Sequence, residues 1–175
     1  MAFDLASVLS QFTGGQSSPN VHDDFDRVAQ NAPPGMLQSG LAGMFNSPQT
    51  PAFGQMAGQL FGNAAPHQQA GMLSQLLNGM GPSVLASLAS GVGGGALGGL
   101  LSRFTGGGAA PQVTPDQASQ LSPADVETVA NHAEQHAPGI VDRMSEFYAQ
   151  HPDLVKTLGG AALTVALAKM AGPQR

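Results

Sequence analysis

Apolar residues recur along this chain three and four positions apart, which is the spacing of one face of an α-helix. The first such stripe joins Leu5, Val8, Leu9 and Phe12. Residues 25–45, 53–80 and 126–148 then repeat a longer unit, in which an Ala-Pro break separates two helical stripes. Proline cannot continue the first helix but fits the first turn of the second. Because no sustained alternation of apolar and polar positions occurs, the pattern predicts an all-α protein made of repeated helical hairpins.

Two helix starts have a recognisable chemistry. Thr50-Pro51 and Ser122-Pro123 each place a hydroxyl that can cap a helix before a proline suited to the first helical position. Asp125 adds an acid to a first turn, where the helix dipole favours it. We therefore expect Thr50 and Ser122 to be N-caps.

Glycine-rich and proline-rich joints near 13–20 and 104–113 divide the chain. We expect an N-terminal helix and linker at 1–19, and a helical-hairpin region containing an uncharged span at 20–103. A Gly/Pro linker at 104–113 and a C-terminal helical domain at 114–175 follow. The stretch Leu-Ser-x-Phe-Thr-Gly-Gly occurs at 9–15 and 101–107, which suits either an internal duplication or two independent helix ends.

Charge is absent from the middle of the chain. No residue between Arg27 and Arg103 is Asp, Glu, Lys or Arg, and only 10% of the chain is charged, against about 25% in average soluble proteins. Charge normally keeps the surface of a monomer hydrated and away from its neighbours. The uncharged span therefore needs another cover: Gln, Asn and Ser side chains, a partner chain, or lipid.

The charge balance also excludes some functions and indicates a location. The net charge is −5 and no basic stripe exists, which argues against nucleic-acid binding. The absence of cysteine excludes disulfides and thiolate chemistry. Asp4 lies where a secretory signal would carry positive charge. We expect a cytoplasmic protein, with a peripheral membrane position as an alternative.

Residues 84–101 are apolar or small throughout, with Gly91, Gly95 and Gly99 at four-residue spacing. This spacing lets helix backbones approach closely. A flexible linker, a close helix contact in an oligomer and a membrane span are the open alternatives. For the interface we single out three glycines and two leucines: Gly91, Gly95, Gly99, Leu76 and Leu77.

The C-terminal run from Leu154 to Ala171 is apolar on most sides, with Lys156 and Lys169 near its ends. It predicts a buried helix. An interfacial anchor whose lysines reach toward a membrane surface is the alternative.

Candidate chemistry is sparse. His132 and His136 are four residues apart, so both imidazoles can face one metal ion, with Glu146 or His151 as a possible third ligand. The alternative is that they form a polar helix flank. No phosphate-binding glycine loop and no G-x-S-x-G turn occurs. We expect no catalytic residue and no cofactor.

The segment from Thr114-Pro115-Asp116-Gln117 to Pro138-Gly139-Ile140-Val141-Asp142-Arg143-Met144 resembles the YidB-like family of small bacterial all-helical proteins. That family shows a similar Thr-Pro-x-Gln start and a later Pro-x-x-Val-Asp-x-Leu segment. The chain departs from the family pattern after Met144. The resemblance implies a small helical bacterial protein without an assigned activity, and it carries over no functional residue.

These observations favour a non-enzymatic, self-associating structural or scaffolding protein. Its partners would be copies of itself, a larger complex, or a lipid surface. A carrier that holds a lipophilic ligand between its helices is one alternative. A metal-binding protein that uses His132 and His136 is the other.

Overall fold

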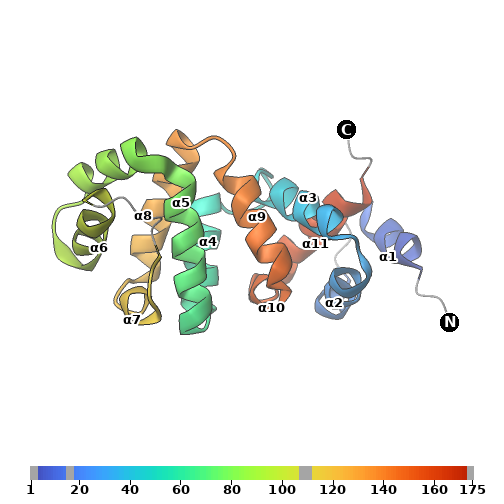
Figure 1. Ribbon diagram of the computed structural model, residues 1–175. Coiled ribbons are helices and arrows are strands. Elements are labelled where there is room, and N and C mark those ends of the chain that lie inside the picture. Colours follow the sequence, from blue (N-terminus) through green and yellow to red (C-terminus); the bar gives the residue numbers. More distant parts are fainter. Residues whose placement is uncertain (1–3, 15–17, 107–111, 173–175) are drawn as a thin grey trace. The chain divides into compact units, whose positions relative to one another are not determined.

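The computed structural model describes residues 4–14, 18–106 and 112–172, which contain helices and no β-strand (Figure 1). The predicted all-α class is confirmed. The described helices, in chain order, are α1 (Leu5–Phe12), α2 (Val21–Asn31), α3 (Pro34–Phe45), α4 (Phe53–Asn63), α5 (Pro66–Gly91), α6 (Gly95–Thr105), α7 (Pro115–Ala118), α8 (Pro123–His136), α9 (Ile140–Gln150), α10 (Pro152–Val155) and α11 (Gly160–Ala171).

Each predicted break separates two helices. Proline is the first residue of α3 and of α5, and the break near residue 138 separates α8 from α9. The most extensive packing, however, joins helices far apart in the sequence: α4 lies on α8, and α3 lies on α11. The chain therefore has the predicted order of helix, break and helix, while its helices bury their apolar faces mainly against non-neighbours.

The two predicted helix starts have different outcomes. Ser122 caps α8 as predicted, because its side chain accepts a hydrogen bond from the backbone N–H of Asp125 at 3.2 Å. The Asp125 carboxylate accepts one in return from the Ser122 N–H. The prediction for Thr50 is wrong, since α4 begins at Phe53. The Thr50 hydroxyl instead donates to the carbonyl oxygens of Met44, at 2.6 Å, and Ser47, and so closes the turn that follows α3.

The chain forms two compact units, and their boundaries differ from the expected ones. One unit comprises Met1–Ala52 and Ser145–Arg175, and the other comprises Phe53–Met144. The expected C-terminal domain at 114–175 is thus divided within α9. Of the expected linker at 104–113, residues 107–111 lie outside the described residues, while Phe104 and Thr105 belong to α6. A break in the helical pattern marks where the chain turns, but it does not determine which faces are buried together.

The first unit is organised around its C-terminal helix. α1, α2 and α3 all pack on α11, where Leu163 and Leu167 are fully buried. Gly40 of α3 permits this packing, because a Cβ there would lie 3.1 Å from the Ala166 carbonyl oxygen. The C-terminal apolar run is therefore largely core, as predicted. It is not the single helix expected, because α10 ends at Val155 and α11 begins at Gly160. Lys156 lies between these helices and pairs with Asp26 at 2.9 Å.

The second unit contains the close helix contact that glycines at four-residue spacing allow. Gly54, Gly58 and Gly62 of α4 face α8. A Cβ on Gly58 would lie 2.8 Å from the Pro123 carbonyl oxygen, and one on Gly62 would lie 3.2 Å from Pro123 Cγ. Small residues at this spacing therefore let the two backbones approach.

Residues 84–101 do not form one helix. α5 is kinked at Gly81, whose φ is +73°, just before Pro82, and it ends at Gly91. α6 begins only at Gly95, so the Gly-rich stretch is the joint between two helices. In the described part of the chain, no helix has both the length and the apolar composition needed to cross a bilayer.

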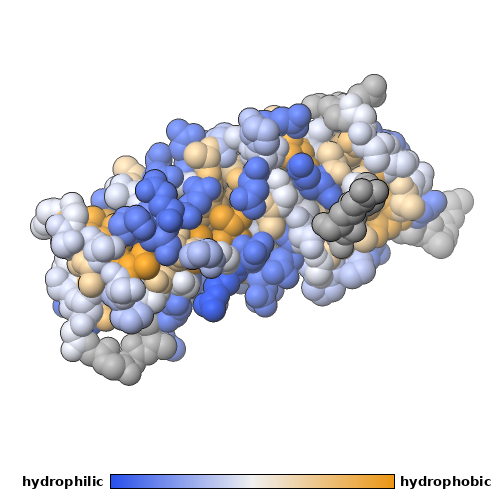
Figure 2. Space-filling model, turned by 90° about the horizontal axis from the view of Figure 1, so that it is seen from above, coloured by the Kyte–Doolittle hydropathy of each residue, from blue (hydrophilic) through white to orange (hydrophobic). Residues whose placement is uncertain are grey.

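The exposed surface of the uncharged span consists of neutral polar side chains together with Gly, Pro and Ala. The large apolar residues of the span, from Leu37 to Leu101, are mostly buried. Figure 2 shows one face of the whole molecule, on which hydrophilic and near-neutral residues predominate and hydrophobic residues form small separate areas. The sequence left three possible covers for this span: Gln, Asn and Ser side chains, a partner chain, or lipid. The first of these is the cover that the chain itself supplies. The exposed Gln, Asn and Ser residues of the span are Gln30, Asn31, Ser39, Asn46, Gln49, Gln55, Gln59, Asn63, Gln75, Asn78, Ser83, Ser87, Ser90 and Ser102.

Candidate functional site

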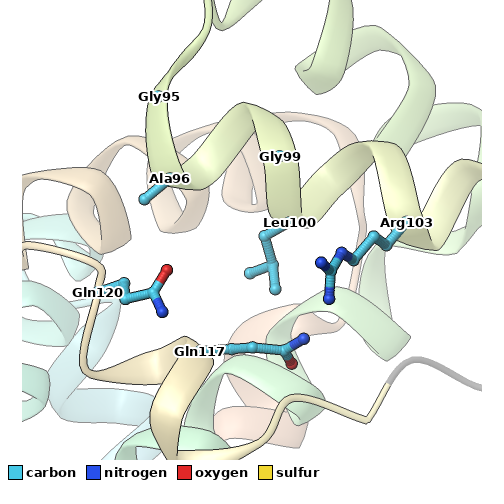
Figure 3. A pocket seen from close by; sticks show the side chains of 7 residues that line it. All are labelled: Gly95, Ala96, Gly99, Leu100, Arg103, Gln117 and Gln120. Carbon is cyan, nitrogen blue, oxygen red and sulfur yellow. The ribbon is translucent and has the colours of Figure 1, made fainter.

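A pocket of about 310 Å³ opens in the second unit between α6 and the segment around α7 (Figure 3). α6 supplies one wall, because positions one, four, five and eight residues after Gly95 lie on a single helical face. The opposite wall carries two glutamines. The lining residues are Gly95, Ala96, Gly99, Leu100, Arg103, Gln117 and Gln120.

A capping box fixes the orientation of Gln117. Its side-chain Oε1 accepts a hydrogen bond from the Thr114 N–H at 3.0 Å, while the Gln117 N–H donates to the Thr114 hydroxyl at 3.3 Å. With Oε1 engaged at the start of α7, the Nε2 amide group is directed away from Thr114. Figure 3 shows this nitrogen on the side of the pocket where the Arg103 guanidinium lies.

Arg103 brings the only formal charge into the pocket lining. In the described part of the chain, no carboxylate forms an ion pair with it. A guanidinium has five N–H donors and no acceptor. Arg103 and the Gln117 amide nitrogen therefore present donors to the same space, and among the described residues no acceptor is paired with them.

Glycine keeps the α6 wall open. A Cβ at Gly95 or Gly99 would meet no atom within 4 Å. Gly95 also has a φ of +88°, which only glycine adopts without strain. The largest apolar side chain of the lining is Leu100, which is buried.

A second pocket, of about 360 Å³, lies between the last turns of α5 and one face of α8. Its central contact joins Ser87 Oγ to His132 Nε2 at 2.9 Å. Serine and histidine can act together as nucleophile and base. Whether this pair could do so depends on which of the two groups donates the hydrogen bond between them. The lining residues are Ser87, Leu88, Gly91, Val92, Thr128, Asn131, His132 and Gln135.

The hydrogen bonds of Ser87 argue against a nucleophile. Its hydroxyl also contacts the Val84 carbonyl oxygen at 2.8 Å. A carbonyl can only accept, so the single hydroxyl proton goes to Val84, and His132 must donate its Nε2–H to Ser87. A histidine that donates to the hydroxyl is not placed to take its proton. His132 also lies against His136, with 4.4 Å between ring centroids.

Among the described residues, none supplies a third ligand beside His132 and His136. In the part of the chain that the structure describes, no three His, Asp or Glu side chains come together as a metal site would require. His151, one suggested ligand, instead places Nδ1 2.9 Å from the Phe147 carbonyl oxygen and stacks on the Phe147 ring.

The structure distributes the predicted interface residues over three places. Gly91 lines the second pocket, and Gly95 and Gly99 line the first. A Cβ at any of the three meets nothing within 4 Å, so none mediates a close helix contact with the described residues. Leu76 and Leu77 are 1% and 0% exposed and belong to the core of the second unit.

Sequence reasoning missed Arg103, Gln117 and Gln120 as pocket residues. Two signals were available: Arg103 is the isolated cation that ends the uncharged span, and Thr-Pro-x-Gln at 114–117 has the spacing of a capping box. Neither signal shows that α6 and α7 lie on opposite sides of one pocket. That arrangement depends on tertiary packing.

Comparisons of the chain with models of known protein families, with curated proteins and with solved structures find no match. The fold and the pockets therefore define only a general class, an all-α protein with two helical units. The Thr-Pro-x-Gln motif that carries part of the YidB-like resemblance also has a local explanation, since it forms the capping box of α7.

Proposed function

We propose that this protein is a non-enzymatic structural protein that associates with copies of itself through the neutral outer face of α4. The observation that carries the proposal is the composition of that face. Gln55, Gln59 and Asn63 are exposed at four-residue spacing, while the opposite side of α4 is buried and its glycines contact α8.

A glutamine face is compatible with itself. An amide group both donates and accepts hydrogen bonds, so the same face on a second copy offers matching partners across a two-fold axis. Gln55 and Gln59 make no side-chain hydrogen bond within the described part of the chain. With a net charge of −5, two copies repel each other least where neither surface carries charge.

The test is sedimentation velocity across a concentration series at low and high salt. We expect the mean mass of the wild type to rise with concentration. The double variant Gln55→Glu/Gln59→Glu places like charges on both copies, so its association should weaken at least tenfold and partly recover in high salt, which screens charge. Gln150→Glu, an exposed glutamine in the first unit, is the matched control. A wild type that stays monomeric throughout the series would refute the proposal.

The other expectations from the sequence accompany this one as proposals. They are a cytoplasmic location and a relationship to the YidB-like family at residues 114–144. The lipophilic-carrier alternative gains no support from the two pockets, because polar side chains line both.

A further inference from the structure

We propose that the pocket between α6 and α7 binds the carboxylate of a small organic acid. The proposal does not depend on self-association. It rests on the donors that the pocket presents and on the absence of a partner for them among the described residues.

Two groups would hold the carboxylate. The Arg103 guanidinium is planar and can donate two parallel hydrogen bonds to a carboxylate. The Gln117 Nε2 group lies on the same side of the pocket, oriented by the capping box through its Oε1 (Figure 3). An acceptor placed between these donors would satisfy both.

The charge of the pocket favours a carboxylate over a phosphate. Arg103 supplies one positive charge, and the other lining residues are neutral. Asp116 is on the same short helix as Gln117 and adds a negative charge to α7. A monoanion is balanced by Arg103 alone, whereas a phosphate dianion would leave excess negative charge close to Asp116.

The remaining lining limits the rest of the ligand. Leu100, Ala96 and the two glycines form a short apolar wall. The Gln120 side-chain amide makes no hydrogen bond within the described residues, so it can bind a second, neutral polar group. The volume of about 310 Å³ is at the small end of ligand pockets. The class that fits is a short aliphatic carboxylic acid with a hydroxyl or keto substituent.

The experiment is a titration of ¹⁵N-labelled protein with lactate, propionate and inorganic phosphate, followed by NMR. We expect saturable shifts at Gly95, Ala96, Gly99 and the Gln117 side-chain amide with lactate. Propionate should bind more weakly, because it offers nothing to Gln120. Phosphate should bind most weakly of the three. Phosphate binding tighter than both acids would overturn the assignment to a carboxylate.

Three variants test whether lactate binds in this pocket. Gln117→Glu keeps an oxygen for the capping box but replaces the Nε2 donor with a negative charge, so lactate affinity should fall at least tenfold with little change in melting temperature. Arg103→Gln should produce a similar loss. Arg143→Gln, an exposed arginine of the same unit outside the pocket, should bind as the wild type does. Shifts that do not saturate, or that persist unchanged in both pocket variants, would refute the proposal.

Discussion

At the scale of single residues, Tyr148 has the least usual environment. Its ring is fully buried between Phe45, at 5.5 Å between centroids, and Phe147, at 5.7 Å. Its hydroxyl has no hydrogen-bond partner in the described part of the chain. Burying an unpaired hydroxyl costs free energy, because contacts with water are lost and not replaced.

Tyr148→Phe should therefore stabilise the protein, since it removes the unpaired group and keeps the ring. We expect the free energy of unfolding to rise by about 1 kcal/mol, measured by urea denaturation at neutral pH. Tyr148→Leu is the comparison, because it removes the hydroxyl together with aromatic packing and should be destabilising. A loss of stability in Tyr148→Phe would show that the hydroxyl contributes a favourable interaction.

Tyr148 also predicts a loss of stability in alkali. Burial raises the pKa of its phenol well above the ordinary value of 10.0. Above pH 10 the unfolded chain loses this proton while the folded chain retains it, so the free energy of unfolding falls as the pH rises. Urea titrations between pH 8 and 11 should show a steeper fall for the wild type than for Tyr148→Phe. Parallel curves would contradict the burial of the phenol.

Lys156 offers a second residue-scale prediction. The hydrogen bond with Asp26 raises the pKa of Lys156, with further contributions from the charges of Asp26 and Asp153. Its contribution to stability is thus complete below the ordinary pKa of 10.5 and is lost as the pH rises through the folded value. Asp26→Asn should cause a small fall in melting temperature that diminishes with added salt, because both side chains are about one-third exposed. Asp23→Asn, at an exposed residue of α2, is the control.

At the scale of elements, local patterns predicted the helices better than their contacts. The stripe from Leu5 to Phe12 coincides with α1, and the Ser122 cap follows from hydroxyl and proline chemistry alone. Thr50 shows the limit, because its hydroxyl can donate to a carbonyl as readily as it can cap a helix. The pocket could not be predicted either. Local sequence patterns indicate the helices that form its walls, but tertiary packing places α6 and α7 on opposite sides of it.

The glycines illustrate this limit most clearly. Four-residue glycine spacing occurs both at 54, 58 and 62 and at 91, 95 and 99, yet only the first set contacts another helix. Nothing local distinguishes the two sets. The second set lines pockets. Gly95 has a positive φ that would strain any other residue, so a substitution there is a poor test of an interface.

Alanine should therefore have opposite effects at Gly58 and Gly99. At Gly58 a Cβ would lie 2.8 Å from the Pro123 carbonyl oxygen, so we expect a loss of about 1–3 kcal/mol in the free energy of unfolding. At Gly99 a Cβ meets nothing within 4 Å, and the higher helix propensity of alanine should give a gain of about 0.5–1 kcal/mol. Thermal and urea unfolding of both variants measures this. Equal losses would mean that Gly99 also lies in a close contact.

At the scale of the whole molecule, the two units differ in how the chain builds them. The second unit is one continuous segment, Phe53–Met144, whereas the first combines residues from both ends. The uncharged span thus contributes to both units, since it includes α3 of the first and α4 and α5 of the second. Composition along the chain could not reveal this division, because it depends on which apolar faces pack together.

The division predicts how fragments of the chain behave. Fragment 53–144 retains the packing of α4 and α5 on α8 and of α6 and α7 on α5, so it should fold alone and melt cooperatively. Fragment 1–52 lacks α11, on which its three helices pack. Its apolar faces then lose their main partner, and it should show little helix. Circular dichroism and thermal melting of the two fragments test this. A cooperative transition in fragment 1–52 would show that its helices do not depend on α11. The lack of one in fragment 53–144 would show that the second unit does not have a core of its own.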